Sequence, residues 1–292
     1  MSLNRAVRFV CSAVAAVVLV VGTVAPASAQ ESADPNPGSI TVTGNVDLLN
    51  QYMFRGIRQN STGVAAWPSG DLALAAYSGE GSLKSAAINF GVWNSLHTGD
   101  TGQDSATGKL WYESDFYSTL SLGFGSGVGL GATYTAYTSP NNGFSTVKEF
   151  MFKLSADDSA YMGKAALKPY AAVAFEVDTA AGSGQADGGA KAGKYLEVGI
   201  APGYAGSKAS LAVPVKVGMS LGDYYELAGV DNKFGYLSVA GVVTVPLGGT
   251  TSYGAWNLHF GAEFQTLGDT TTALNGGDDS QLIYSGGFGF TY

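Results

Sequence analysis

The sequence is short of cysteine, histidine and charge. Of its 292 residues, one is cysteine, two are histidine and 13% are charged, about half the charged share of an ordinary soluble domain. A single cysteine excludes disulfide frameworks and thiolate metal sites, and the two histidines do not stand at a metal-binding spacing, so we expect no cofactor and no metal. After residue 29, no apolar run reaches the roughly 20 residues that a membrane-spanning helix needs.

The first 29 residues have the pattern of an export signal. Arg5 and Arg8 precede the apolar run FVCSAVAAVVLVVGTVA, and Ala27 and Ala29 fit an A-x-A cleavage site. The alternative is a membrane-anchoring helix, but the polar residues that follow Ala29 favour cleavage. We therefore predict a cleaved secretory signal peptide at 1–29, a short polar segment at 30–39 and one domain at 40–292.

Cleavage would leave a strongly acidic chain. The first 29 residues hold two arginines and no acid, so the remaining 263 residues carry 13 basic and 23 acidic side chains, a net charge of −10. Nucleic acid is a poor partner for such a chain, because its phosphates require basic surface.

Glycine and tyrosine are abundant, at 42 and 16 residues, and apolar and polar side chains alternate along long segments. The alternation holds over 10 to 16 residues, which suits tilted strands that cross a bilayer better than the short strands of a soluble β-sandwich. The pattern predicts about 12 strands: 40–58, 65–79, 83–97, 109–125, 128–139, 144–155, 168–178, 194–205, 209–222, 233–246, 252–266 and 280–292. The expected fold is all-β, a transmembrane antiparallel up-and-down β-barrel with short turns at one end and long loops at the other.

The predicted faces assign each side chain to lipid or to the lumen. Tyr52, Phe54, Tyr112 and Phe124 are expected in an aromatic girdle at the lipid interface, and Trp111 in the lumen. The final strand places Phe288, Phe290 and Tyr292 on one face at the end of the chain. This pattern resembles the signal that delivers outer-membrane barrels to their insertion machinery, which is an expected partner; the alternative is that these rings only form part of the girdle.

Three motifs resemble those of a known family. NVDLLNQYMFRGIRQN runs from Asn45 to Asn60, GVWNS from Gly91 to Ser95, and ESDFY from Glu113 to Tyr117. They are similar to motifs of the TorF family of porin-like outer-membrane proteins, which carry the Gcw_chp domain. The resemblance implies a cell outer-membrane location and a porin-like function. One departure is that Asn50-Gln51 replaces the Ser-Asp of the family.

The predicted lumen is acidic. Its expected acids are Asp47, Asp71, Glu113, Asp115, Glu149, Glu176, Glu197 and Glu263, against the basic Arg55, Lys153 and Lys216. We predict a lumen constriction formed by Asp47, Arg55, Trp93, Glu113 and Asp115, with Arg55 facing the two carboxylates of Glu113 and Asp115. The alternative is a structural role, in which Arg55 and these carboxylates only cross-link the wall. Carboxylate-rich pores favour cations.

The sequence therefore predicts a narrow channel for passive diffusion of small hydrophilic solutes, cationic or neutral, surrounded by outer-membrane lipid. The alternative is a non-conducting barrel that serves as a scaffold or binds a partner at the surface. We expect no enzymatic activity, because the nearest candidate, His259 beside Glu263, lacks a recognisable nucleophile.

Overall fold

The structure is a computed structural model that describes residues 38–60, 62–99, 109–177, 184–189, 191–249, 251 and 253–292. The predicted signal peptide and residues 30–37 of the predicted polar segment lie outside the described residues. None of the described helices has the length and the apolar character required to cross a membrane.

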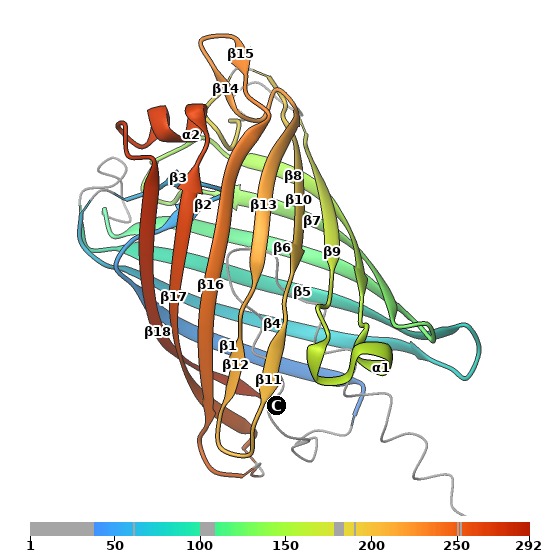
Figure 1. Cartoon of the computed structure of the whole chain (residues 1–292). Helices are drawn as coiled ribbons and strands as arrows, with labels where there is room; N and C mark the ends of the chain where they lie inside the picture. Colours follow the sequence, from blue (N-terminus) through green and yellow to red (C-terminus); the bar gives the residue numbers. More distant parts are fainter. Residues whose placement is uncertain are drawn as a thin grey trace, which may run out of the picture.

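The described residues form a closed antiparallel β-barrel (Figure 1). Its strands are β1 (Ile40–Leu49), β4 (Ala65–Ser78), β5 (Leu83–His97), β6 (Trp111–Phe124), β7 (Val128–Thr138), β8 (Val147–Ala156), β9 (Tyr170–Glu176), β10 (Lys194–Ile200), β11 (Gly203–Ala205), β12 (Ser210–Ala212), β13 (Val215–Gly222), β16 (Phe234–Pro246), β17 (Ala255–Leu267) and β18 (Ser280–Thr291). β10 with β11, and β12 with β13, are each one barrel strand interrupted near Pro202 and Pro214, which lack the N–H that a ladder uses. Fourteen labelled strands thus make 12 barrel strands, as predicted.

The barrel closes where β1 pairs with β18. Val42 and Tyr292 exchange backbone hydrogen bonds of 2.6 and 2.8 Å there. Phe290 packs over Gly44, at a place where any Cβ would overlap its ring, and stacks on Trp256 with ring centroids 5.2 Å apart. The last residues of the chain therefore complete the wall.

The outer face is apolar and the inner face is polar, as the alternation predicts. The exposed large apolar side chains include Leu48, Leu72, Phe90, Phe116, Leu120, Phe150, Phe152, Leu154, Val243, Phe260, Phe264, Phe288 and Tyr292. Seven of the eight acids predicted for the lumen are buried and Glu263 is partly buried. This face pattern is the one expected for a barrel surrounded by lipid.

Small elements lie in the connections. The hairpin of β2 (Met53–Phe54) and β3 (Ile57–Arg58) follows β1, and the hairpin of β14 (Glu226–Leu227) and β15 (Val230–Asp231) follows β13. Helix α2 (Asp269–Leu274) lies between β17 and β18 at the same end of the barrel (Figure 1). Helix α1 (Ser159–Met162) and the 3-10 turn η3 (Gly163–Ala165) occupy the connection between β8 and β9 at the other end.

Four face predictions are wrong, those for Tyr52, Phe54, Trp111 and Tyr112. The first strand ends at Leu49 and not at residue 58. Tyr52 is buried inside the barrel and Phe54 packs against the same buried cluster, instead of facing lipid. In β6, a register shift opposite Ser95 and Leu96 inserts Tyr112 as an extra residue. This β-bulge turns Tyr112 inward and leaves Trp111 on the outside, the reverse of the prediction, because a bulge changes the side to which the flanking residues point.

Candidate functional site: the hairpin in the barrel mouth

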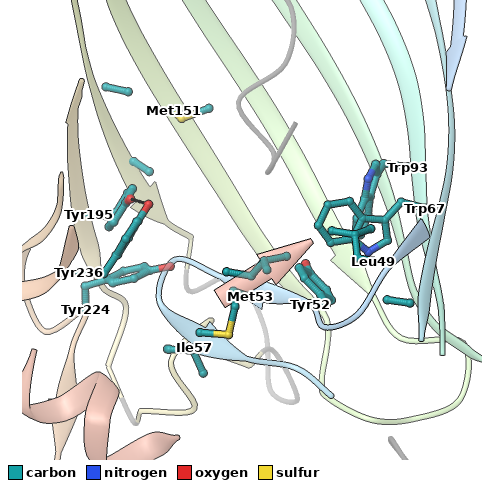
Figure 2. Close-up of a cluster of buried hydrophobic side chains, with 14 of the residues drawn as sticks. Leu49, Tyr52, Met53, Ile57, Trp67, Trp93, Met151, Tyr195, Tyr224 and Tyr236 are labelled. Atoms are coloured by element: carbon teal, nitrogen blue, oxygen red, sulfur yellow. Dashed lines mark hydrogen bonds between the residues drawn. The ribbon is translucent and has the colours of Figure 1, made fainter. Parts of the chain in front are cut away.

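The β2–β3 hairpin folds into the mouth of the barrel at the end with the long loops (Figures 1 and 2). Its turn residues Arg55 and Gly56 have φ angles of 47° and 82°. Two consecutive positive φ angles define the tight type I′ turn, which suits the twist of a hairpin. A Cβ at Gly56 would lie 3.1 Å from the side chain of Tyr236, so the turn is packed directly against the wall.

The hairpin lies between two aromatic groups of the wall (Figure 2). On one side are Tyr195, Tyr224 and Tyr236, and on the other are Trp67 and Trp93. Tyr52 meets the second group, with ring centroids 5.1 Å from Trp67 and 5.4 Å from Trp93. Tyr52, Met53 and Ile57 are all buried. Full burial of such side chains stabilises the docked hairpin by about 1.5–3 kcal/mol each.

Arg55 anchors the tip of the hairpin to the wall. Its two terminal nitrogens donate to the two carboxylate oxygens of Glu149 in β8, at 2.6 and 2.8 Å. The guanidinium also donates to the hydroxyl of Tyr224 at 2.9 Å and lies 4.1 Å from the ring centroid of Tyr195. The Tyr225 hydroxyl donates to the backbone carbonyl of Arg55 at 2.9 Å. The side chains of Arg55 and Glu149 are 8% and 2% exposed, so this is a buried ion pair.

Asn275, directly after α2, holds the turn and the second strand of the hairpin. Its side-chain amide donates to the Gly56 carbonyl at 2.8 Å and accepts from the Arg58 backbone N–H at 2.8 Å. Asn275 is 1% exposed, and both hydrogen bonds therefore lie away from water. Two separate parts of the barrel thus grip the hairpin from different sides: the wall strand β8, and the loop that contains α2.

The predicted pairing of Arg55 with Glu113 and Asp115 is wrong. Arg55 lies on the hairpin and not on a barrel strand, and the hairpin turn points it at Glu149. Glu113 and Asp115 are neighbours on β6, 4% and 0% exposed. Neither contacts a lysine or an arginine in the described part of the chain, and neither oxygen of Asp115 has a hydrogen-bond partner there.

The other predicted constriction residues occupy separate places. Asp47 on β1 contacts His259 on β17, with 2.5 Å between carboxylate oxygen and ring nitrogen. Trp93 is buried against Tyr52 and Trp67. The five predicted residues therefore do not form one ring: Trp93 contacts the hairpin, Arg55 belongs to it, and Asp47 forms its own pair in the wall.

A second buried cluster surrounds Glu197 on β10. The hydroxyls of Tyr170, Tyr195 and Tyr236 donate to its carboxylate at 2.7, 2.8 and 2.9 Å. The ammonium of Lys153 lies 4.4 Å from the ring centroid of Tyr170. Tyr195 links this cluster to the Arg55 anchor, because its ring contacts the guanidinium and its hydroxyl contacts Glu197.

Sequence reasoning missed the residues that grip the hairpin, namely Tyr195, Tyr224, Tyr225 and Asn275. The Arg-Gly pair at 55–56 is a turn signal that could have located the hairpin. Nothing local marks the missed residues: the hydrogen bonds of Tyr224, Tyr225 and Asn275 to the hairpin join positions 169 to 219 apart in sequence.

No family model and no curated protein matches the chain. Solved structures of similar fold include outer membrane phospholipase A from Escherichia coli, at 11% identity and a TM-score of 0.45, covering 85% of this chain and 92% of that one. The NanC porin is 13% identical with a TM-score of 0.42, covering 86% of this chain and 98% of that one. An outer membrane channel from Pseudomonas putida F1 is 11% identical with a TM-score of 0.45, covering 87% and 94%.

These similarities concern the fold alone, and they correct one expectation. Because barrels of similar fold include a phospholipase, the prediction of no enzymatic activity is wrong as an exclusion: such a barrel can be an enzyme or not. The resemblance to the TorF family stays a prediction. The chain has the closed 12-strand antiparallel fold of outer-membrane β-barrels.

Proposed function

We propose that this chain is an outer-membrane channel for small hydrophilic solutes, with a preference for cationic or neutral ones. The observation that carries the proposal is the division of its faces, with an apolar exterior around an interior that holds eight acids. An apolar exterior suits contact with lipid, and a polar interior suits a water-filled passage.

The cation preference follows from how the interior acids are paired. Glu149 has Arg55 and Asp47 has His259, whereas Glu176 accepts two backbone N–H groups. Glu113 and Asp115 have no cationic partner in the part of the chain that the structure describes. Unpaired carboxylates in a narrow polar passage attract cations and repel anions.

The proposal includes the route to the membrane. The first 29 residues serve as a cleaved signal peptide, and Phe288, Phe290 and Tyr292 serve as the recognition signal for the barrel-insertion machinery. Among outer-membrane proteins, the proposal assigns the chain to the TorF family. The exposed Phe288 and Tyr292 on the final strand are in keeping with this role.

The hairpin supports a second candidate, a barrel that does not conduct. Tyr52, Met53 and Ile57 are buried in the mouth, so the hairpin narrows the passage at that end. A barrel with a permanently filled mouth would act as a scaffold or through its loops.

Single-channel recording separates the two candidates. The protein is refolded in detergent, its folding is checked by heat-modifiable gel mobility, and current is recorded across a planar bilayer under a salt gradient. A reversal potential with cation preference supports the channel, and silence from a folded barrel favours the second candidate. Glu113→Gln with Asp115→Asn should reduce cation preference, whereas the exposed pair Glu80→Gln with Asp279→Asn, which removes the same charge, should not.

A further inference from the structure

The groups that surround the Arg55 guanidinium belong mostly to the barrel wall. Glu149 comes from β8, Tyr195 from β10, and Tyr224 from the connection after β13. Only Phe54, whose ring centroid lies 5.0 Å from the guanidinium carbon, comes from the hairpin itself. The wall strands and the connection after β13 therefore form a socket, and the hairpin supplies the group that fills it.

The chemistry of this socket is specific for a planar cation. A carboxylate that receives two parallel N–H bonds matches the fork of a guanidinium, and aromatic faces attract a cation by their ring quadrupole. Glu149 provides the first feature at 2.6 and 2.8 Å, and Tyr195 provides the second at 4.1 Å. The Tyr137 hydroxyl also contacts Glu149, at 3.3 Å, and fixes the position of the carboxylate.

Two further acidic side chains lie near Glu149 in the wall. Asp115 lies close enough to Glu149 to interact with it electrostatically, and Glu113 is next to Asp115. Asp115 is fully buried and both of its carboxylate oxygens lack a partner in the described residues. Glu113 and Asp115 thus add two carboxyl groups to the neighbourhood of Glu149, beyond the one that Arg55 engages directly.

We propose that this socket is a binding site for solutes that bear a guanidinium group, and that Arg55 occupies it as a tethered substitute for the solute. The inference rests on the proposed channel function and names the solute class of that channel. Because Arg55 is on the same chain, its effective concentration at the socket is in the millimolar range or above, on the order expected for a short tether. A free solute binds there when the hairpin leaves or when the arginine side chain is removed.

The test removes the tethered occupant and supplies a free one. Arg55→Ala is compared with Arg55→Ala/Glu149→Gln, each refolded and checked by heat-modifiable gel mobility. Binding of guanidinium chloride and of methylguanidinium chloride is measured by calorimetry, with sodium chloride at equal ionic strength as the reference. Arg55→Gln serves in the same comparison if Arg55→Ala does not fold, because it keeps much of the side-chain stem.

We expect Arg55→Ala to bind guanidinium about tenfold or more tightly than the double variant does, since charged hydrogen bonds to Glu149 carry the recognition. It should also prefer guanidinium to sodium. Equal binding by the two folded variants, or no preference over sodium, would overturn the proposal.

A second measurement, of conductance in potassium chloride, tests the channel function independently of guanidinium binding. Guanidinium binding by a folded barrel that never conducts would support the socket and refute the channel. Conduction without selective guanidinium binding would refute the socket and leave the channel standing.

Discussion

Replacing Arg55 by alanine should make the hairpin leave the barrel mouth more often. The substitution removes both N–H bonds to Glu149 and the contact with Tyr195, and it leaves a buried carboxylate without its cation. Breaking one side of a buried ion pair costs about 3–5 kcal/mol. Every 1.4 kcal/mol is a factor of ten, so the population of undocked hairpin should rise about 10²- to 4 × 10³-fold.

Most molecules should still keep the hairpin docked. Tyr52, Met53 and Ile57 remain buried against the wall and together contribute about 5–9 kcal/mol of apolar burial. The expected change is therefore a more frequent opening and not a loss of the fold. The two Asn275 hydrogen bonds, to the turn at Gly56 and to β3 at Arg58, do not involve the Arg55 side chain.

A thiol on the hairpin measures this opening. Met53→Cys, with Cys11 replaced by serine, places one cysteine on a side chain that is 8% exposed in the docked hairpin. Its rate of reaction with a water-soluble maleimide reports the undocked population when reclosing is faster than labelling. Arg55→Ala should raise that rate about 10²- to 4 × 10³-fold, in proportion to the undocked population.

A surface ion pair provides the control. Lys233 and Asp231 form a pair in which the lysine side chain is 68% exposed, so Lys233→Ala should change the labelling rate by less than about fivefold. An unchanged labelling rate in the Arg55→Ala background would refute the reasoning, because it would show that the ion pair does not hold the hairpin. The double variant Arg55→Ala/Glu149→Gln should lose less docking free energy than the sum of the losses in the two single variants, since the unpaired carboxylate is then gone.

Three further changes have defined outcomes. Asn275→Ala leaves a turn carbonyl and a backbone N–H of the hairpin unsatisfied, at about 1–3 kcal/mol each, and should raise maleimide labelling with the barrel folded by gel mobility. Gly44→Val forces the ring of Phe290 away from the barrel seam and should lower the unfolding midpoint in urea, whereas Gly241→Val, on a position with open space, should not. In the connection between β8 and β9, the backbone N–H groups of Lys168 and Leu167 donate to the Asp158 carboxylate and hold its pKa below the usual value, Lys168 having the larger effect. These hydrogen bonds are complete above about pH 4 and are lost as the pH falls through the lower pKa of the folded state. The amide NMR shifts of Leu167 and Lys168 should follow this titration and lose it in Asp158→Asn; a titration of these two amides that persists in the variant would contradict the assignment.

Face alternation predicted the barrel because one signal covers every strand. Successive side chains of a strand point to opposite faces of the sheet, so alternating apolar and polar residues put all apolar groups on one face and all polar groups on the other. With the apolar face in lipid, Leu48, Phe116 and Phe260 could be placed outside from the sequence. The same signal failed after Leu49. Tyr52 and Phe54 continue the alternation, so the sequence places them in lipid. A hairpin that folds into the barrel also shields apolar side chains from water, and the alternation does not distinguish the two environments.

The candidate site was less predictable than the fold, because its contacts are distant in sequence. The lumen acids could be recognised individually, but the choice of Glu149 over Glu113 as the partner of Arg55 depends on where the hairpin turn points. The bulge at Tyr112 is a similar case: one extra residue reverses the flanking side chains without any change of composition.

The mixture of groups in the socket suits a hairpin that both docks and leaves. An apolar plug on an apolar socket would be at least as stable as a buried ion pair, since the desolvation of two charges offsets much of their attraction. Opening such a plug would expose apolar surface to the water of the lumen. Glu149 and the hydroxyl of Tyr224 are instead readily hydrated when Arg55 withdraws, so the polar socket lowers the cost of the open state relative to the docked one. Converting the pair to apolar residues, as in Arg55→Leu/Glu149→Leu, should therefore slow maleimide labelling of Met53→Cys below the rate of the intact ion pair, and faster labelling would show that the charges themselves provide the hold.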